Sequence, residues 1–211
     1  MVPLRSYPPY VLLVIEHLKA GMNGAASLLP TLRFAYLNRS LNNMMIAENE
    51  AEEYQLAEQK KQVYLNRVNQ LFGHIKNWLK EESVAVKQQD IEIVEKFTGH
   101  YTVPSLSIST QAGQKLVDIN PGGAYTLMAE GLLDVEGGFG REHVMYIVEG
   151  GPYINKLASD EKDKLIRQQT YKDIDDDGWY WIEETLRDKA HFMNKNALIE
   201  IITQVSDYEF V

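Results

Sequence analysis

The sequence predicts an α+β protein: an N-terminal long helix or helical hairpin, then a small antiparallel β-sandwich or barrel, and a C-terminal helix. Two observations predict this class. Residues 31–72 contain neither glycine nor proline over 42 consecutive positions, which is typical of helix. Beyond residue 84, short runs rich in branched side chains alternate with glycine-containing turns, which is typical of antiparallel strands. We therefore expect a coiled-coil-like helical region at 1–83 and a β-domain at 84–211.

Composition limits the class of protein and its partners. The chain has 211 residues, of which 45% are hydrophobic, enough for one or two packed domains. Its net charge of −9 argues against binding along a nucleic-acid backbone, which needs a basic surface. The absence of cysteine excludes disulfides and cysteine-ligated zinc and favours a reducing, cytoplasmic location. The apolar run at 11–15 is too short to span a membrane or to form a signal-peptide core, so no membrane partner is expected.

The helical region begins with a short helix in which Pro8-Pro9, in the first turn, are followed by the residues 10–18, with Gly21 and Gly24 after its end. In the long segment that follows, the Asn- and Ser-rich stretch 38–43 is the only composition suited to a turn. Two arrangements stay open. A hairpin turning there buries its apolar stripes within one chain, whereas a continuous helix needs a second chain to cover them.

One apolar stripe in this region follows the helical period. Its members are spaced by multiples of three and four residues, so they share one broad face of a helix. Large aromatic groups on such a face are good anchors for an interface. We expect this stripe to bind a second copy of the chain or another protein, through Tyr54, Tyr64, Val68, Leu71, Ile75 and Trp78.

Six strands are expected in the β-domain, at 90–95, 105–109, 115–119, 125–128, 132–136 and 143–148. Turns are expected between them, among them 120–123, 137–140 and 150–152. The tail then predicts a charged helix at 159–169 and a hairpin whose arms, 169–174 and 179–183, meet at Asp177-Gly178. A final helix at 196–205, capped by Asn194 or Asn196, is expected to dock its apolar side on the β-domain.

The sharpest local motif is an acidic loop. Asp173, Asp175 and Asp177 are followed by Gly178, and Glu184 stands at the twelfth position, as in an EF-hand calcium loop. Position eight holds Tyr180 in place of the usual branched aliphatic residue, and the chain has one such loop where these sites work in pairs. The tight hairpin turn explains the same residues, so calcium is an alternative and no other cofactor is expected.

A second motif resembles that of a known family. Arg67 and His74 are separated by six residues, as in the arginine–histidine motif of HEPN-type ribonucleases, which place both residues on a helix at a dimer cleft. The resemblance covers these two residues alone. It implies a nuclease; Arg and His at this spacing are more often solvated residues on the side of a helix.

Asp134, Glu136 and His143 form the last candidate group. The first two share one face of an expected strand, and His143 follows the next turn. A solvent-facing strand explains them better than a catalytic cluster.

Taken as a whole, the sequence favours a non-enzymatic protein-interaction or assembly subunit, in which the helical arm mediates self-association or partner docking. An acidic, cysteine-free bacterial or phage accessory protein has this composition. The alternatives are a calcium-binding module using 173–184 and a HEPN-like or other hydrolase or nuclease.

Overall fold

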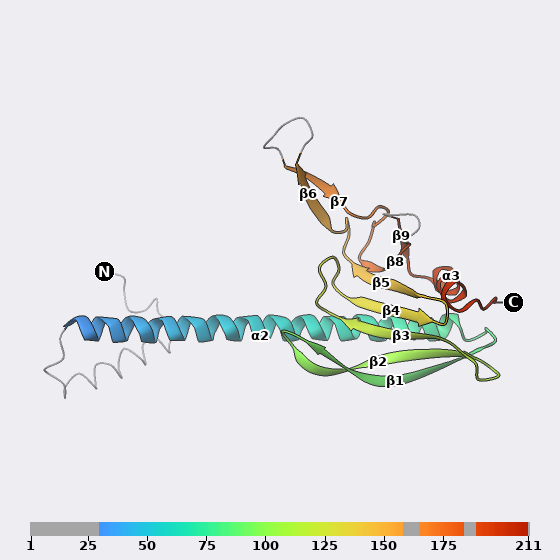
Figure 1. Cartoon of the computed structure of the whole chain (residues 1–211), viewed down its shortest axis with the longest axis horizontal. Helices are drawn as coiled ribbons and strands as arrows, with labels where there is room; N and C mark the ends of the chain where they lie inside the picture. Colours follow the sequence, from blue (N-terminus) through green and yellow to red (C-terminus); the bar gives the residue numbers. More distant parts are fainter. Residues whose placement is uncertain (1–29, 158–164, 184–188, 211) are drawn as a thin grey trace. The chain divides into compact units, whose positions relative to one another are not determined.

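The computed structural model describes residues 30–157, 165–183 and 189–210 (Figure 1). The chain divides into two compact units, residues 1–52 and residues 53–211. The second unit holds the β-strands and the C-terminal helix, so the fold class is α+β with an antiparallel sheet. The expected helix at 10–18 lies outside the described residues.

Helix α2 runs from Pro30 to Trp78, and the stretch 38–43 lies within it. Its second half is the part that packs. Ala57, Tyr64, Val68 and Leu71 are buried, because their spacing of seven, four and three keeps them on one side of the helix. Gly73 interrupts good helix formers without ending the helix, since the packing on either side of it outweighs the roughly 1 kcal/mol that glycine costs.

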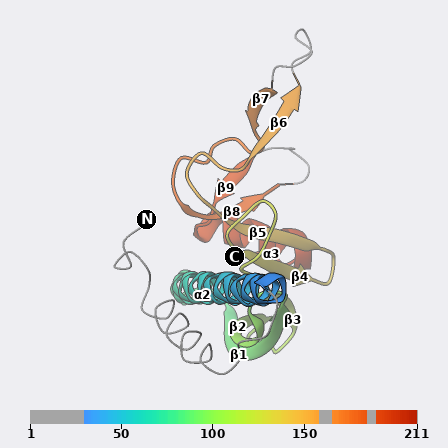
Figure 2. The same ribbon diagram turned by 90° about the vertical axis from the view of Figure 1, so that its left-hand side faces the viewer.

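The main sheet has seven antiparallel strands in the order β1-β2-β3-β4-β5-β8-β9. Viewed along α2, the sheet curls partly around the helix (Figure 2). Among the described residues the order is linear with β1 and β9 at its ends, so the sheet is open where a sandwich or barrel was expected. The strands are β1 (Val84–Glu95), β2 (Gly99–Thr110), β3 (Lys115–Gly123), β4 (Leu132–Gly137), β5 (Arg141–Ile147), β8 (Gly178–Ile182) and β9 (Ala190–Phe192).

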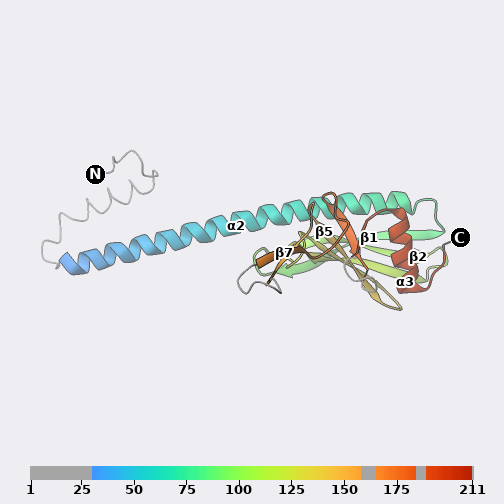
Figure 3. The ribbon, with the colours of Figure 1, turned by 90° about the horizontal axis from the view of Figure 1, so that it is seen from above.

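A helix covers the face that a second sheet would cover in a sandwich. Tyr64, Phe72 and Ile75 of α2 belong to the same buried cluster as Val103 and Leu133 of the sheet. Seen from above, the second half of α2 lies along the sheet and the C-terminal helix crosses one end of the sheet (Figure 3). The core is therefore a helix-on-sheet core, the other common way to bury one face of a sheet.

Two expected elements between β3 and β4 are wrong. Residues 120–123 belong to β3 and do not form a turn, and 125–128 form a loop and no strand. Tyr64 explains the extension of β3, because its hydroxyl accepts the Gly123 N–H at 3.1 Å and donates to the Leu132 carbonyl at 2.8 Å. A helix side chain thus completes the backbone hydrogen bonding where the strand ends.

The expected helix at 159–169 is also wrong in its described part. Residues Leu165–Gln169 form β7, which pairs with β6 (Tyr153–Leu157) in a separate two-stranded sheet. Leu165 and Ile166 are adjacent and are followed by three polar residues, so the sequence shows neither a helical nor a strand period here, and the pairing with β6 decides the structure. Residues 158–164 lie outside the described part of the chain.

The expected hairpin around Asp177-Gly178 does not form. Residues 179–182 are in a strand as expected, but β8 pairs with β5, where Trp181 lies opposite Val144, and with β9. Residues 178–181 are all buried, because β8 is an internal strand with a neighbour on both sides. The run Trp179-Tyr180-Trp181 reflects this two-sided burial.

Helix α3 (Lys195–Ser206) confirms the final expected element. The side chain of Asn194 accepts hydrogen bonds from the N–H groups of Asn196 and Ala197, so it is the N-cap. Leu198, Ile201, Ile202 and Val205 are buried in the main core. The apolar side of α3 therefore docks on the β-domain, as its period predicts.

A polar network fastens the end of β1 to the loop after β3. Glu95 accepts the hydroxyl of Tyr101 and, at 2.8 Å, the backbone N–H of Tyr125. Burial, together with the neighbouring Glu95 carboxylate, raises the pKa of the Tyr101 hydroxyl well above its usual range. Burial likewise raises the pKa of Tyr64. Both tyrosines are therefore neutral hydrogen-bond donors at physiological pH.

Candidate functional site

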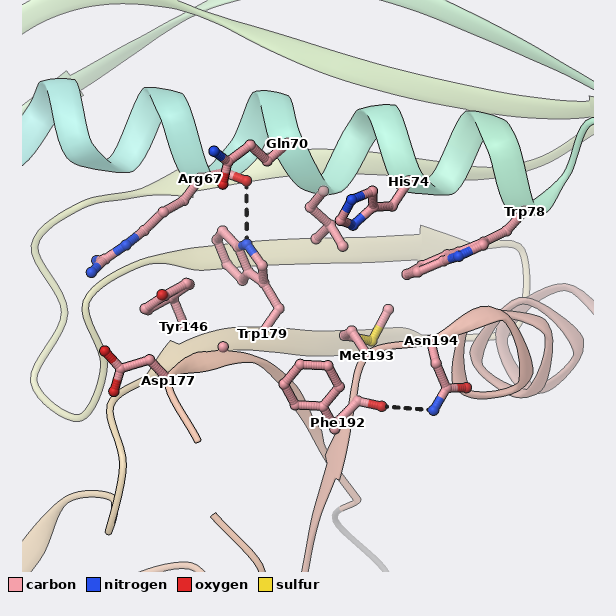
Figure 4. Close-up of a pocket in the computed structure, with 12 residues that line it drawn as sticks. Arg67, Gln70, His74, Trp78, Tyr146, Asp177, Trp179, Phe192, Met193 and Asn194 are labelled. Atoms are coloured by element: carbon pink, nitrogen blue, oxygen red, sulfur yellow. Dashed lines mark hydrogen bonds between the residues drawn. The ribbon is translucent and has the colours of Figure 1, made fainter. Parts of the chain in front are cut away.

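A cavity of about 410 Å³ lies beside α2 in the second unit (Figure 4). One wall comes from α2, where Gln70, His74 and Trp78 recur every four residues and so share one side of the helix. The opposite wall comes from β8, β9 and the residues that lead into α3. We call this hollow the α2–β8 cavity.

The lining of the α2–β8 cavity is mainly aromatic. Trp179 and Phe192 face Trp78 across it, and Met193 lies between them (Figure 4). Edge-on ring contacts hold two of these rings in place: Trp179 against Tyr146 with ring centroids 5.5 Å apart, and Phe192 against Tyr180 at 5.3 Å. The cavity is therefore preformed, which is typical of sites that accept an apolar or aromatic group.

Arg67 belongs to the wall of the cavity. Its Nη1 atom lies 2.9 Å from Glu130 Oε2, and its guanidinium lies 3.7 Å from the centre of the Tyr146 ring. The backbone carbonyl of Arg67 accepts the Trp179 indole N–H at 3.3 Å. The cation is thus matched by a carboxylate and a ring face, and it braces the strands against α2.

Both residues of the HEPN-like motif line this cavity, as the two-turn spacing between them predicts. His74 is exposed and lies against Trp78, with ring centroids 5.8 Å apart. Glu130 already neutralises Arg67, and Asp177 adds a negative charge to the lining. This surrounding does not favour a phosphate group, and the nuclease stays a prediction resting on the two residues.

The acidic loop precedes β8. Asp177 Oδ1 accepts the backbone N–H of Glu149 at 2.8 Å, and Asp173 has a positive φ of 63°. Within the described residues, no three His, Asp or Glu side chains are gathered closely enough to hold a metal ion. Glu184 lies outside those residues, so the calcium site is still a prediction.

Four of the six expected interaction residues are in the core of the second unit. Tyr64, Val68, Leu71 and Ile75 are at most 4% exposed, because the β-sheet of the same chain covers this side of α2. As folded, they are not on the surface for a partner. Tyr54 is 62% exposed, and Trp78 is half-buried in the cavity wall.

The group at Asp134 and His143 has the cross-strand geometry expected from its spacing. These residues are directly opposite on β4 and β5, and His143 Nδ1 lies 2.7 Å from Asp134 Oδ1. Glu136 pairs with Arg141 at 3.1 Å on the same two strands. Both pairs are partly exposed and line no cavity described above, as expected of a solvent-facing part of the sheet.

Sequence reasoning missed most of the α2–β8 cavity. Gln70, Tyr146 and Phe192 come from α2, β5 and β9, Met193 follows β9, and none of these residues belongs to a motif. The sequence offered one signal for the cavity: Trp78 and Trp179 are large aromatic groups, but nothing in the sequence indicates that they lie near each other. Only the pairing of β8 with β5 brings them together.

Within the described residues, neither α2 nor α3 contains an apolar stretch long enough for a membrane span. Comparison with protein-family models, curated proteins and solved structures finds no match for this chain.

Proposed function

We propose that this chain is a non-enzymatic assembly subunit, and that α2 binds the α2 helix of a second copy in antiparallel orientation. The observation that carries the proposal is the exposure of apolar side chains on α2 outside the core. Leu56 is 65% exposed and Val63 is 44% exposed, although the neighbouring Ala57 and Tyr64 are buried.

Leu56 and Val63 are seven residues apart, so they lie on the same side of α2, about 100° from the buried side. Met45 and Ile46, earlier in the same helix, are 62% and 55% exposed. Scattered exposed apolar residues are normal, but a series along one helix marks a surface that another helix can cover.

Charge along α2 supports a second copy as the partner. Residues 48–58 contain five glutamates and no lysine or arginine, whereas residues 59–80 contain five basic residues and no acidic one. Lys60, Lys61, Arg67, Lys76 and Lys80 are the basic residues. The helix dipole does not explain this segregation, because the change of sign falls far from either end of α2.

A two-fold axis near Gln59 accounts for both the exposed apolar residues and the segregation of charge along α2. In an antiparallel pair about this axis, Leu56 of each copy lies opposite Val63 of the other, and each acidic half lies opposite a basic half. Such a contact is isologous and closes at two copies. The apolar pair supplies contact energy, and the charges select antiparallel over parallel pairing.

Sedimentation velocity tests the proposal. The chain has a mass of 24.1 kDa, and we expect twice that mass at micromolar concentration. The double substitution Leu56→Glu/Val63→Glu is expected to give the monomer mass, because it places four like charges at the contact.

A matched control adds the same charges one residue earlier, in Gln55→Glu/Gln62→Glu. Both glutamines are exposed and also seven residues apart, but they lie on another side of α2. This variant is expected to keep the dimer mass. A wild-type chain that stays monomeric up to about 100 µM would contradict the proposal, since weak but specific protein complexes form in that range.

A further inference from the structure

The turn between β4 and β5 carries an exposed phenylalanine. Phe139 stands between Gly138 and Gly140 and is 74% exposed. A Cβ atom added at either glycine would meet nothing within 4 Å, so the tip of the turn lies in open space. The backbone of the turn is nonetheless fixed, because Gly137 N–H donates to the Gly140 carbonyl at 2.9 Å and Phe139 N–H to the Val205 carbonyl at 2.8 Å.

The α2–β8 cavity has the chemistry to receive such a ring. Its rings come from Trp78, Trp179 and Phe192, and Met193 adds a deformable thioether. Its volume of about 410 Å³ is at the small end of ligand pockets, which suits one side chain better than a large ligand.

Phe139 cannot enter the cavity of its own chain. Asn194, the N-cap of α3, lines the cavity, whereas Val205, in the last turn of α3, holds the Phe139 backbone. Asn194 and Val205 are eleven positions apart in the chain, which corresponds to about 16 Å along a helix. The Phe139 backbone and the cavity are therefore held at opposite ends of α3, whose apolar side is buried in the core.

Charges beside the two features are complementary. Arg141 follows Phe139 by two residues, and its side chain is 51% exposed in a surface pair with Glu136. Asp177 precedes Trp179 by two residues and lines the cavity, next to the exposed Asp175 and Asp176. An arginine in a weak surface pair can exchange partners at little cost.

We propose that Phe139 of one copy inserts into the α2–β8 cavity of the next, with Arg141 facing Asp177. This inference rests on the proposed assembly role but uses a different surface from the antiparallel α2 contact. The two surfaces that meet are different, so the contact is head-to-tail and can repeat into a ring or an open chain.

Sedimentation of the Leu56→Glu/Val63→Glu variant separates this contact from the one made by α2. At micromolar concentration this variant is expected to be monomeric. As its concentration approaches the millimolar range, we expect its weight-average mass to rise above the monomer mass, and we expect Phe139→Ala in the same background to raise the dissociation constant at least about tenfold. Phe97→Ala is the matched control, because Phe97 is a 50% exposed phenylalanine on another turn, and it is expected to leave the association unchanged.

Mixing two variants, each of which lacks one of the two contact surfaces, tests the head-to-tail contact more directly. In the same background, Phe139→Ala keeps the cavity, and Phe192→Ala/Asp177→Lys keeps the phenylalanine. Neither is expected to associate alone, but together they should form a 1:1 dimer and nothing larger.

The synthetic peptide Gly-Gly-Phe-Gly-Arg supplies a probe that needs no assembly. It should change the tryptophan fluorescence of the Leu56→Glu/Val63→Glu variant, whereas Gly-Gly-Ala-Gly-Arg should not. Circular dichroism verifies that each variant is folded. A strictly monomeric mass in this background, together with no fluorescence change at millimolar peptide, would overturn the inference and leave the α2 dimer to be judged on its own test.

Discussion

Residues 43–56 and residues 57–78 of α2 share a helix-forming composition and differ in surroundings. Both stretches are rich in helix formers and carry apolar side chains. In the first stretch every side chain that the structure describes is exposed, whereas in the second a stripe from Ala57 to Ile75 is buried against the sheet. The helical period thus predicts that a face will be covered, but it does not predict what covers it.

The largest expected effect on stability comes from replacing one leucine in each stretch by alanine. Leu71 is 4% exposed and Leu56 is 65% exposed. We expect Leu71→Ala to lower the free energy of unfolding by about 2–5 kcal/mol, because it leaves a cavity in the core. Leu56→Ala is expected to change it by less than about 0.5 kcal/mol.

Urea denaturation, at a concentration where the chain is monomeric, measures both changes. Equal losses in the two variants would show that residues 43–56 are covered within one chain, and the comparison would fail.

A pH titration compares a tyrosine from each stretch. Burial raises the pKa of Tyr64, so the folded chain keeps this proton at pH values where the unfolded chain, with a tyrosine pKa near 10, releases it. The contribution of Tyr64 to stability is therefore full below about pH 10 and is lost as the pH rises above it, by up to about 1.4 kcal/mol per pH unit.

The free energy of unfolding between pH 8 and pH 11.5 tests this expectation. Tyr64→Phe should flatten the alkaline decline and lower stability at neutral pH, because the Gly123 N–H and the Leu132 carbonyl lose their partner. Tyr54→Phe, in the exposed stretch, should leave the decline unchanged. A decline of the same steepness in all three proteins would refute the assignment to Tyr64.

The smallest expected effect is a gain in stability. A Cβ atom at Gly73 meets nothing within 4 Å, and this residue lies inside α2. We expect Gly73→Ala to raise the free energy of unfolding by about 0.5–1 kcal/mol, since alanine restricts the unfolded chain and favours helix.

The melting temperature of Gly73→Ala measures this gain, and Gly131→Ala is the control variant, for which the opposite change is expected. A Cβ atom at Gly131 would lie 2.9 Å from the Tyr64 ring, so that variant should melt lower. A lower melting temperature for Gly73→Ala would mean that the exposed side of α2 is closely covered at this point.

Local sequence determined the elements that carry their own signals. The cap at Asn194 fixes where α3 begins, because its side chain satisfies N–H groups of the first helical turn. Period-two patterns found each of the strands β1 to β5, but they missed the first six residues of β1 and of β2 and added a false strand at 125–128. Single motifs did less well, since the Asp177-Gly178 signal for a hairpin was overridden by the pairing of β8 with β5.

Phe139 and the cavity illustrate what the sequence leaves open. The glycines beside Phe139 are visible in the sequence, but its 74% exposure depends on where α3 lies. The cavity needs Trp78, Trp179 and Phe192 to face one another, from positions up to 114 residues apart.

By itself, the sequence determined the α+β class, the helical period of α2, a final helix capped by Asn194 or Asn196, and the absence of cysteine chemistry. These follow from residues close together in the chain, whose propensities and hydrogen bonds act locally. Only the tertiary structure decided that the chain's own sheet covers Tyr64, Val68, Leu71 and Ile75, that β8 inserts beside β5, and that the aromatic cavity exists. Whether a side chain is buried depends on residues that are distant in the sequence. The pattern of apolar residues predicts that a face will be covered, but it does not predict which residues cover it.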